Sequence, residues 1–487
     1  MIRHKPTSAF NKKRKRFNQA KAVIAVAIFV ALLLSAHYVA AGAFLVLVYL
    51  SHELLWSDHV FYDPKADYEH QLLADQVVKV TIQNGVISLP DDVAQYDSCF
   101  LQVGLKADWL GYLFDPFVAV ASAPLDAPGK LHQRQYFERR LSGRRYLNLS
   151  HAIGPDSRQL HLSPRYCRLA ADAVLYCGRA VALENQKILV ISPHADDAEL
   201  AAFGLYRQRN SFILTITAGE TDADYYLPLV RGASDDNVAA ARIKGRLRAW
   251  DSIAIPLWGG VPQHQTHQLG YFCLTLQQMS QQPDSTIPSH AADLTQPEYF
   301  RGFNALQTTP SRYPPSSWRA LVDDIGRMIE QVKPDIIVMP HPALDPHSDH
   351  RYASKAVFEA CALAPVAPDT FLLYANHYYH TDRFPFGPAN TIATLPPDFD
   401  KRPPVRIMSL PLTVEAQQDK LMALFMQHDL LIPCKLKKKL RYLLQAWFIK
   451  RPRNRYGDDE YFRKAIRANE IFYQVDRAQL ANLVAEL

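Results

Sequence analysis

Two segments of the chain place histidines and aspartates close together, directly after apolar runs. The first is His194-Ala195-Asp196-Asp197, which follows the run KILVIS at 187–192. The second is PHPALDPHSDH at 340–350, which follows DIIVM and brings His341, Asp345, His347, Asp349 and His350. Imidazole and carboxylate groups are metal ligands as well as general acids and bases. The two segments therefore indicate a catalytic metal site, provided that the fold brings them together.

The elements around these segments alternate between strands and helices. Strands are predicted at 187–192, 212–220, 255–258, 335–340 and 370–376, and helices at 198–209, 237–254, 317–332 and 352–364. This order is typical of a Rossmann-like, doubly wound parallel sheet with helices on both faces, which we assign to residues 186–487. Ligands bind at the carboxyl ends of the strands in such a sheet, where both segments lie. Residues 259–316 show no period and are expected to form a lid or substrate loop.

Spacing within the first segment favours a shared ion. Residues three apart across a tight turn can face one point, so His194 and Asp197 can hold one metal together. A histidine from the second segment would complete a three-ligand site with an open position, the catalytic form of zinc coordination. Asp196 would then lie beside the metal as a general base. For either segment alone, a helix-capping role is an equal alternative.

The residues also resemble a known family. PHADDAE at 193–199 resembles the PHPDDE signature of the PIG-L/LmbE-like zinc de-N-acetylases, and HSDHRYA at 347–353 resembles the HxDH motif of that family. ITAGE at 216–220 is similar to the segment that follows the family's first helix. The resemblance covers 187–375 and extends at most to DDEYFRKA at 458–465. It departs from the family at three positions: Ala195 replaces proline, Ala198 precedes the acid Glu199, and Gly245 stands where a glutamate is usual.

The resemblance implies a set of roles. It makes His194, Asp197 and His350 the ligands of Zn²⁺, Asp196 the base, and His347 the group that stabilises the oxyanion or protonates the leaving amine. Further candidate substrate contacts are Arg242, Glu220 and His377. The implied reaction is hydrolysis of the acetamide of an N-acetylhexosamine, with release of acetate. The alternatives are a non-catalytic glycan-binding or scaffold protein and a metal-dependent esterase.

The N-terminal region is typical of a membrane anchor. Residues 22–50 are apolar with His37 as the only ionisable group, and about 20 such residues span a bilayer as a helix. Eight Lys and Arg precede this segment, so we predict a basic cytoplasmic tail at 1–21 and a transmembrane anchor at 22–50. The expected location is the bacterial inner membrane, crossed once, with the catalytic domain in the periplasm. His37 near the middle leaves open a re-entrant hairpin that returns the chain to the cytoplasmic face.

Residues 60–185 read as short strands separated by turns, which is typical of a β-sandwich or jelly roll. Asn84-Gly85 between two β-branched stretches predicts a hairpin over 77–89. Trp109, Tyr112 and Phe114 are expected either to stack on a sugar or to pack in the interior. Cys167 and Cys177 can pair in an oxidising compartment, although buried thiols are the simpler reading.

The excess of positive charge is confined to two stretches. Residues 1–21 and 435–455 hold 17 of the 54 Lys and Arg and no acid, so the remaining chain has a net charge of −11 against +6 overall. This distribution excludes a nucleic-acid-binding protein with a basic face. Basic and apolar residues interleave at 435–455, which predicts an amphipathic helix for an anionic membrane surface or a phosphorylated glycan, or else a solvated helix face. The expected substrate is therefore membrane-associated: a lipopolysaccharide core, a glycolipid or a surface polysaccharide.

Overall fold

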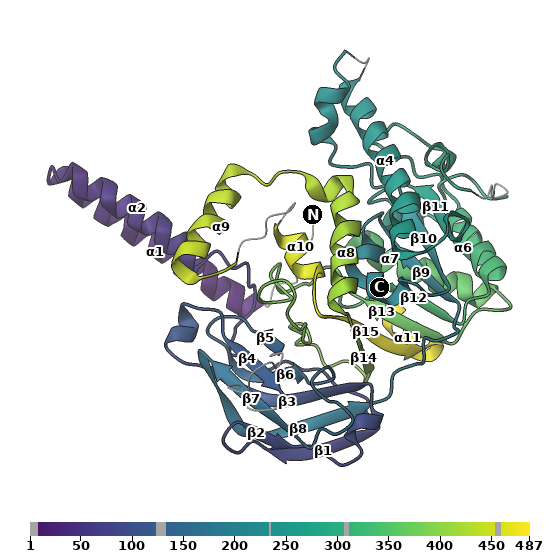
Figure 1. Ribbon diagram of the computed structural model, residues 1–487. Coiled ribbons are helices and arrows are strands. Elements are labelled where there is room, and N and C mark those ends of the chain that lie inside the picture. Colours follow the sequence, from purple (N-terminus) through teal and green to yellow (C-terminus); the bar gives the residue numbers. More distant parts are fainter. Residues whose placement is uncertain (1–7, 123–132, 233–234, 306–310, 453–458) are drawn as a thin grey trace.

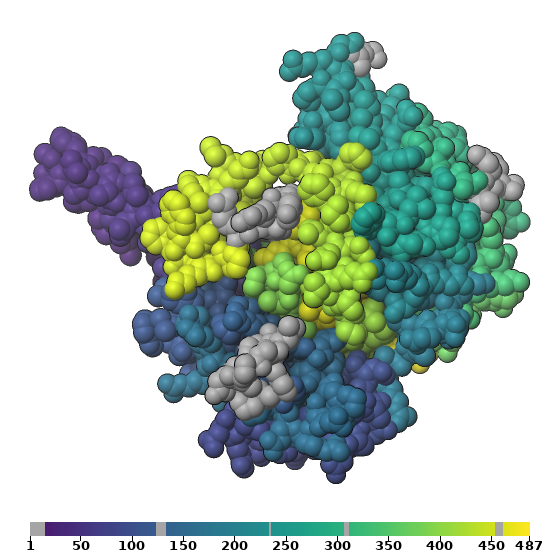
Figure 2. All heavy atoms as spheres, viewed as in Figure 1, coloured from purple at the N-terminus to yellow at the C-terminus, as the bar shows by residue number. Residues whose placement is uncertain are grey.

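The computed structural model describes residues 8–122, 133–232, 235–305, 311–452 and 459–487 (Figure 1). An N-terminal pair of helices leads into a region of two sheets, which is followed by an α/β domain. The helical pair projects from the body of the molecule (Figure 2).

The α/β domain is built on a seven-stranded sheet with the strand order β11-β10-β9-β12-β13-β15-β14. Its strands are β9 (Ile188–Ser192), β10 (Ser211–Thr217), β11 (Thr266–Tyr271), β12 (Ile336–Pro340), β13 (Thr370–Tyr374), β14 (Arg406–Pro411) and β15 (Asn469–Asp476). The first five strands are parallel, whereas β15 runs antiparallel to both β13 and β14. The purely parallel sheet that we expected is therefore wrong at one edge, and the sheet is mixed.

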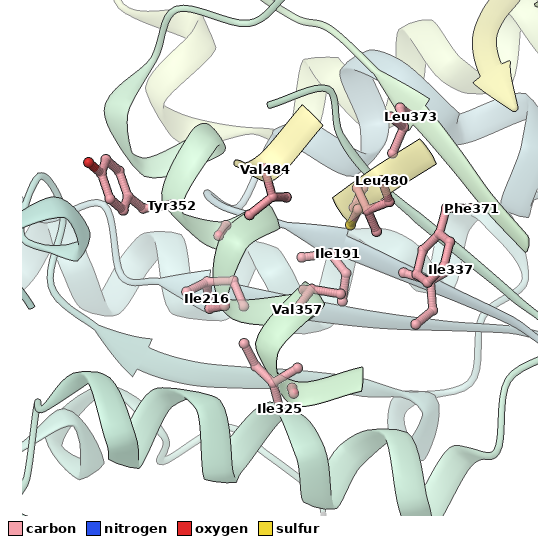
Figure 3. Close-up of a cluster of buried hydrophobic side chains, with 14 of the residues drawn as sticks. Ile191, Ile216, Ile325, Ile337, Tyr352, Val357, Phe371, Leu373, Leu480 and Val484 are labelled. Carbon is pink, nitrogen blue, oxygen red and sulfur yellow. The ribbon is translucent and has the colours of Figure 1, made fainter. Parts of the chain in front are cut away.

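Helices cover both faces of this sheet, as predicted. On one face Leu189 and Ile191 join a core formed with α6 (Trp318–Val332), α7 (Ser348–Leu363) and α11 (Arg477–Val484) (Figure 3). On the other face Ile188 and Val190 pack with α3 (Asp197–Tyr206) and α8 (Val414–Met426). A strand alternates its side chains between the two faces, so the continuous apolar run of β9 is buried on both sides. Each such side chain contributes about 1.5–3 kcal/mol to stability.

The segment 259–316 contains an element that the sequence did not reveal. β11 pairs with β10 in parallel and forms the edge of the sheet. All its residues are buried, yet Thr266, His267 and Gln268 are polar, so no apolar run marks the strand. The strand expected at 255–258 is wrong, because Ile255–Gly259 forms a 3-10 helix after α4 (Asp236–Ala254). The rest of the segment includes α5 (Leu276–Gln281) and a 3-10 turn at Pro297–Phe300.

The region that precedes this domain consists of two four-stranded antiparallel sheets. One has the order β1-β8-β3-β6 and the other β2-β7-β4-β5. Their strands are β1 (Gln76–Thr81), β2 (Val86–Ser88), β3 (Ser98–Ala107), β4 (Phe117–Ala121), β5 (Gln133–Tyr136), β6 (Ser142–Asn148), β7 (Gln159–Arg165) and β8 (Cys167–Gly178). Side chains of both sheets, Leu101 and Val120 among them, share one hydrophobic core.

The hairpin expected over 77–89 is correct in its turn and wrong in its pairing. Asn84 and Gly85 both have positive φ (51° and 75°), and Gln83 and Val86 exchange two backbone hydrogen bonds. Beyond that bridge, however, β1 pairs with β8 and β2 pairs with β7. The turn therefore connects the two sheets instead of joining neighbours in one sheet.

The cysteine pairing that we considered is wrong. Cys167 and Cys177 lie on the same strand, β8, and ten residues of strand separate two side chains by about 33 Å. A disulfide requires Cα atoms within about 7 Å. Instead, Cys99 of β3 lies opposite Cys177, with the two Sγ atoms 3.4 Å apart.

The N-terminal helices form a hairpin. α1 (Ser8–Leu34) and α2 (Tyr38–Leu55) are separated at Ser35–His37, where Ala36 has a positive φ of 60° and the Ser35 hydroxyl donates to Ala31 O. Both Lys15–Leu34 and Tyr38–Leu55 are long and apolar enough to cross a membrane. The single helix expected over 22–50 is wrong, because the chain reverses at this break.

Two further helices complete the described chain. α9 (Leu436–Ile449) falls within the predicted amphipathic segment, and α10 (Asp459–Ala465) follows it. Residues 453–455 of that segment, and residue 458 of the last family-like stretch, lie outside the described residues.

Candidate metal centre

The fold brings the two His/Asp segments together. β9 and β12 are neighbours, and β10 lies on the other side of β9, so the chain order reverses at this point in the sheet. The loop after β9 carries His194, and the loop after β12 carries His347 and leads into α7. The first loop is tight because the Ser192 hydroxyl donates to His194 O (2.5 Å) and accepts from Ala198 N (3.1 Å). Both His/Asp segments therefore lie at the carboxyl edge of the sheet, where ligands bind in folds of this kind.

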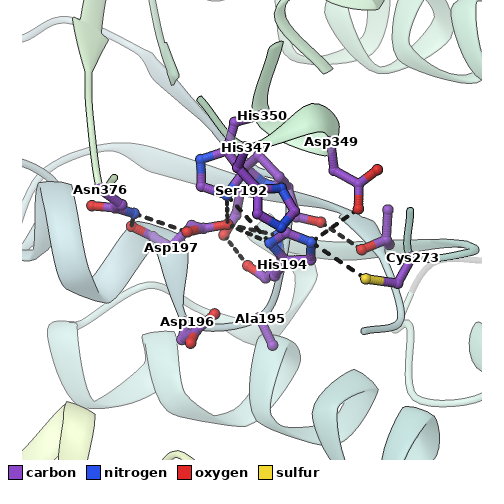
Figure 4. A network of polar contacts seen from close by, with 12 residues as sticks. Ser192, His194, Ala195, Asp196, Asp197, Cys273, His347, Asp349, His350 and Asn376 are labelled. Atoms are coloured by element: carbon purple, nitrogen blue, oxygen red, sulfur yellow. Dashed lines mark hydrogen bonds and ion pairs between the residues drawn. The ribbon is translucent and has the colours of Figure 1, made fainter. Parts of the chain in front are cut away.

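Three donor atoms converge at this edge (Figure 4). His194 Nδ1 and His350 Nε2 are each 3.1 Å from Asp197 Oδ2, and the two nitrogens are 3.3 Å from each other. We call these residues the three-donor cluster. Zinc bonds of about 2.0–2.1 Å place tetrahedral ligands about 3.3 Å apart. The cluster thus has the spacing of three ligands on one ion.

The hydrogen bonds behind the cluster fix which nitrogens carry protons. His350 Nδ1 lies 2.9 Å from Asp345 Oδ2, and His194 Nε2 lies 3.2 Å from Asp349 Oδ2. Because a carboxylate accepts, these two nitrogens donate. In the neutral rings the other two nitrogens then present lone pairs, which face the Asp197 carboxylate. Three acceptors at this separation repel one another unless a cation lies between them, so the donor set fits a metal ion.

Neighbouring groups hold every member of the cluster. Asn376 Nδ2 donates to Asp197 Oδ1 (2.8 Å), and the backbone N–H groups of Asn376 and His377 donate to Asp345 Oδ2 (3.0 and 3.2 Å). Leu274 N donates to Asp349 Oδ2 (2.8 Å). Such partners orient metal-binding histidines and carboxylates.

The charges of Asp197 and His350 stabilise each other. Burial would raise the pKa of Asp197, but His350 and His194 lower it well below its ordinary value. Burial likewise opposes the charged form of His350, yet Asp197 and Asp345 raise its pKa to about 10. The cluster therefore stabilises positive charge at the point where its donor atoms meet.

His347 lies against the cluster. Its ring centroid is 4.9 Å from that of His194 and 4.8 Å from that of His350. A nitrogen of His347 lies within 4.8 Å of the ring nitrogens of the other two, so it is a further possible ligand. Burial and the two neighbouring histidines lower its pKa to about 3, which favours a neutral ring. Its buried Nδ1 has no hydrogen-bond partner among the described residues.

Asp196 lies apart from the three donor atoms, although it is adjacent to Asp197 in sequence. No dashed contact reaches its carboxylate in Figure 4. Its Oδ1 instead accepts from Arg248 Nη2 of α4 (2.9 Å), and Arg248 Nη1 also donates to Asp429 Oδ2 (2.8 Å). Arg248 is buried. The ion pair fixes the direction of the Asp196 side chain.

The candidate substrate contacts differ in their surroundings. His377 stacks on His347 with ring centroids 5.5 Å apart. Glu220 is buried, accepts from Ser289 Oγ (2.7 Å), and burial raises its pKa. Arg242 donates to Ala292 O and Asp293 O (2.8 and 3.0 Å). Only His377 is adjacent to the cluster, whereas the other two residues hold the 259–316 segment in place.

Packing explains why glycine stands at position 245, where the family usually has a glutamate. A side chain at Gly245 would collide with the ring of Phe300 and with Cβ of Glu220. Phe300 belongs to the 3-10 turn of the 259–316 segment and is fully buried. That segment therefore occupies the space beside α4 that a glutamate at position 245 would need.

A cavity of about 330 Å³ adjoins residues that contact the cluster, although none of the three cluster residues lines it. Its lining includes Asn376, His377 and Tyr378 from the loop after β13, and Lys438 of α9 and Lys464 of α10. Pockets for small ligands have volumes of about 300–1,000 Å³. The cavity is therefore large enough for a sugar.

Several residues around the cluster were not predicted as site residues. Asn376, Arg248 and Cys273 come from distant parts of the chain, and Cys273 Sγ lies 3.7 Å from His194 Nε2. Cys273, Asp349 and His194 form a second group of donor atoms within 4.8 Å of one another. Burial raises the pKa of the Cys273 thiol, which disfavours the thiolate that binds metal, so this second group is less suited to hold an ion.

Comparison with known proteins agrees with the geometry. Residues 189–361 match the family model described as PIG-L, GlcNAc-PI de-N-acetylase. No curated protein matches the chain. The solved structures that are similar to it include the following three. The N,N'-diacetylchitobiose deacetylase from Pyrococcus horikoshii has 15% identity, covers 61% of this chain and 86% of its own, and gives a TM-score of 0.33. The zinc-inhibited form of teicoplanin deacetylase Orf2 has 18% identity, 59% and 98% coverage and a TM-score of 0.30. The 4-carboxy-2-hydroxymuconate hydratase GalB from Pseudomonas putida has 12% identity, 60% and 95% coverage and a TM-score of 0.27.

All three residues of the three-donor cluster lie within the matched range. The resemblance read from PHADDAE and HSDHRYA is confirmed, and the α/β domain that carries these motifs is of the PIG-L type.

Proposed function

We propose that this protein is a zinc-dependent de-N-acetylase. Its substrate would be an N-acetylhexosamine in a membrane-associated glycan, such as a lipopolysaccharide core, a glycolipid or a surface polysaccharide, and its product acetate and a free amine. The observation that carries the proposal is the convergence of His194 Nδ1, Asp197 Oδ2 and His350 Nε2 within 3.1–3.3 Å. The PIG-L family match supports the amide as the bond cleaved.

His194, Asp197 and His350 would hold Zn²⁺. Two imidazoles and one carboxylate form a donor set that catalytic zinc accepts, and they leave a position for water or substrate. When bound, zinc lowers the pKa of water to about 7 and polarises a carbonyl.

Asp196 would accept the proton of the attacking water at its carboxylate. Arg248 orients that carboxylate through the 2.9 Å hydrogen bond. His347, a neutral imidazole against the cluster, would donate an N–H to the acyl oxygen as it gains charge. Such a donor is worth about 3–4 kcal/mol in other hydrolases. The departing nitrogen must then receive a proton, which Asp196 carries after the first step.

The cavity beside the cluster would receive the sugar, with His377 as its contact nearest the reacting amide. Glu220 and Arg242 would act indirectly, because their hydrogen bonds hold the 259–316 segment against the loop after β10 and against α4. This segment would thus form a fixed wall of the site.

The other parts of the chain would place this site at a membrane. Residues 60–185 would form a separate β-sandwich domain, and 186–487 the deacetylase domain. The apolar residues 22–50 would anchor both in a bilayer, which the exposed side chains of α1 and α2 support.

The test is release of acetate from membrane glycolipid extracts and from N-acetylated and O-acetylated sugars. We expect acetate together with a free amine from N-acetyl substrates. Asp196→Asn should lower kcat by about 10²–10⁴-fold and keep the metal. His264→Ala, at an exposed histidine of a 3-10 turn, is the matched control and should retain full activity. Release from O-acetyl sugars alone would indicate an esterase, and a folded, metal-loaded protein without turnover on either class would refute the proposal.

A further inference from the structure

The helical hairpin presents an apolar surface to its surroundings. Most of its large apolar side chains are exposed, including Val23, Ile24, Val26, Leu34, Val39, Leu45, Val46 and Leu47. A folded protein in water rarely exposes so continuous an apolar surface. The hairpin therefore requires an apolar environment.

The length of the hairpin sets how deep it can reach. Between Lys21 and the break, α1 has 13 uncharged residues, 22–34, and α2 has 13 more at 38–50. At 1.5 Å per residue each apolar arm is about 20 Å long. The hydrocarbon core of a bilayer is about 30 Å thick. Each uncharged arm is therefore long enough to enter one leaflet deeply but shorter than the whole core. The full helices are long enough to cross, but a crossing would draw Lys21 of α1 and Glu53 of α2 toward the core, whereas insertion into one leaflet would not.

The open end of the hairpin carries the features of a membrane interface. Lys21 Nζ lies 3.3 Å from the centroid of the Trp56 ring, and the Arg140 guanidinium lies 4.5 Å from the same centroid. The Phe17 and Trp56 rings are 6.0 Å apart, so the start of α1 and the end of α2 lie together. Tryptophan with lysine and arginine is typical of the headgroup level.

α9 lies beside this end and presents a matching face. Leu436, Leu440, Leu443 and Trp447 recur at the spacing of one helical stripe, and Lys437 and Lys439 fall on its two sides. Leu436, Leu440 and Trp447 are exposed, as are both lysines. The opposite face is buried through Gln445 and Ile449. An apolar stripe between lysines is the pattern of a helix that lies in an anionic membrane surface.

Polar contacts fix α9 against the hairpin. Arg441 Nε donates to Glu53 Oε2 (2.5 Å), and Gln445 Nε2 donates to Glu53 O and to Ser57 Oγ (3.1 Å each). α9 and α2 therefore form one unit, and their exposed apolar surfaces are held in a fixed relation.

Arg451, just after α9, extends this unit to the two-sheet region. It pairs with Asp58, which follows α2, and with Asp115, which precedes β4. Asp58 also pairs with Arg139 (2.5 Å). Burial raises the pKa of Asp58, but Arg451 and Arg139 outweigh it and lower the pKa well below the ordinary value. The carboxylate is therefore charged. The network of ion pairs joins the helical hairpin, the end of α9 and the two-sheet region.

The two-sheet region adds a third contact. Its turn at Leu110–Tyr112 carries exposed Trp109, Tyr112 and Leu113. Tyr112 lines a cavity of about 490 Å³ together with Phe17 and Trp56 at the open end of the hairpin. Tyr112, for which stacking on a sugar and packing in the interior were both open, thus lies beside the anchor.

We propose that the hairpin inserts into one leaflet of an anionic bilayer, with α9 and the Leu110–Tyr112 turn lying on the surface of that same leaflet. The chain enters and leaves on one side, so the catalytic domain shares the face of the basic residues 1–21, which is the cytoplasmic face. Lys438 of α9 also lines the cavity beside the metal centre, so the surface that contacts lipid adjoins the substrate cavity. Only this last point rests on the proposed deacetylase function.

The side of the membrane is tested in bacterial cells with the full chain fused at Leu487 to each of two reporters. One is a fluorescent protein that matures in the cytoplasm, and the other a phosphatase that is active only after export. We expect fluorescence without phosphatase activity, and an active phosphatase would overturn the proposal.

The depth of the hairpin is tested with Ala36→Cys in a chain whose half-buried Cys273 and Cys434 are replaced by serine. A membrane-impermeant maleimide added outside spheroplasts should leave residue 36 unmodified until detergent is added. Modification without detergent would show that the tip crosses the bilayer and would overturn insertion into one leaflet.

The contact of α9 is tested with a polarity-sensitive fluorophore on the same serine background. The purified full chain is placed in vesicles that contain phosphatidylglycerol, with the label at Leu440→Cys or, as control, at Leu363→Cys, an exposed leucine at the end of α7. We expect several-fold brighter emission at 440 than at 363. In the 440-labelled chain, Lys437→Gln with Lys439→Gln should reduce this difference, since each lysine contributes roughly fivefold to partitioning. Equal emission at the two sites would overturn the contact. None of these readouts depends on metal or turnover, so their failure is distinguishable from failure of the proposed function.

Discussion

Replacing Asp345 by asparagine should weaken metal binding without removing a ligand. Asp345 Oδ2 accepts from His350 Nδ1 (2.9 Å) and from the backbone N–H groups of Asn376 and His377 (3.0 and 3.2 Å). Its Oδ1 accepts from His347 N (3.0 Å). His350 and His377 help to lower the pKa of Asp345 to about 2, against the effect of burial, so the group is ionised at neutral pH. Asparagine removes that charge and one acceptor oxygen.

The magnitude follows from these contacts. Removing a partner of a metal-binding histidine typically costs 10–100-fold in affinity. Asp345 is fully buried and holds four donors, so we expect the upper end, about 100-fold, or about 2.8 kcal/mol. The same substitution frees the His350 ring to rotate, which should also slow turnover of the loaded enzyme.

The assay is competition for zinc between the purified protein and a chelator, with thermal unfolding recorded to show that the variant folds. Asp398→Asn is the matched control, because Asp398 is a buried carboxylate of the same domain that pairs with Arg402. The control should bind zinc as the unchanged protein does. A folded Asp345→Asn variant with unchanged zinc affinity would refute the reasoning that His350 is oriented for a metal.

Three further predictions concern packing, titration and topology. Gly245→Ala should lower the free energy of unfolding by about 1–3 kcal/mol, because its Cβ has no room, whereas Gly326→Ala, in an open position of α6, should raise it slightly; denaturant unfolding measures both. Burial lowers the pKa of His341 to about 3, so the unfolded chain takes up a proton from about pH 6.5 downward while the folded one does not. The free energy of unfolding should therefore fall by at most about 1.4 kcal/mol per pH unit as the pH is lowered from about 6.5 to about 3. His341→Asn should reduce this slope. Parallel curves of unfolding free energy against pH for the variant and the unchanged protein would contradict the assignment. In protein from intact bacteria, Cys99 and Cys177 should both react with an alkylating reagent after denaturation, since a cytoplasmic location keeps thiols reduced; a disulfide between them would indicate export.

The sequence predicted those parts of the molecule whose signals are local. The apolar runs predicted β9 and β12, and because parallel strand ends bring their loops together, His194, Asp197 and His350 converge as the motifs led us to expect. The turn at Asn84-Gly85 was also correct for a local reason: both residues tolerate positive φ.

The parts that could not be predicted depend on partners distant in sequence. Asn376 and Arg248 contact Asp197 and Asp196 only after the sheet forms, and neither stands in a motif. β11 is buried but polar, because its polar groups are satisfied by the segment around it. The backbone N–H of Gln268, for example, donates to Asn304 Oδ1 (2.8 Å). The break at Ser35–His37 interrupts an apolar run without proline or glycine, so hydropathy alone reads one helix.

Metal analysis of four purified variants tests the central claim most directly. The claim is that His194, Asp197 and His350 form the metal site, while Asp196 and His347 act beside it. The unchanged protein should hold about one zinc per chain, Asp197→Ala and His350→Ala should lose it, and Asp196→Asn and His347→Ala should keep it while losing activity. Retention of zinc by Asp197→Ala together with its loss from Asp196→Asn or His347→Ala would contradict the account.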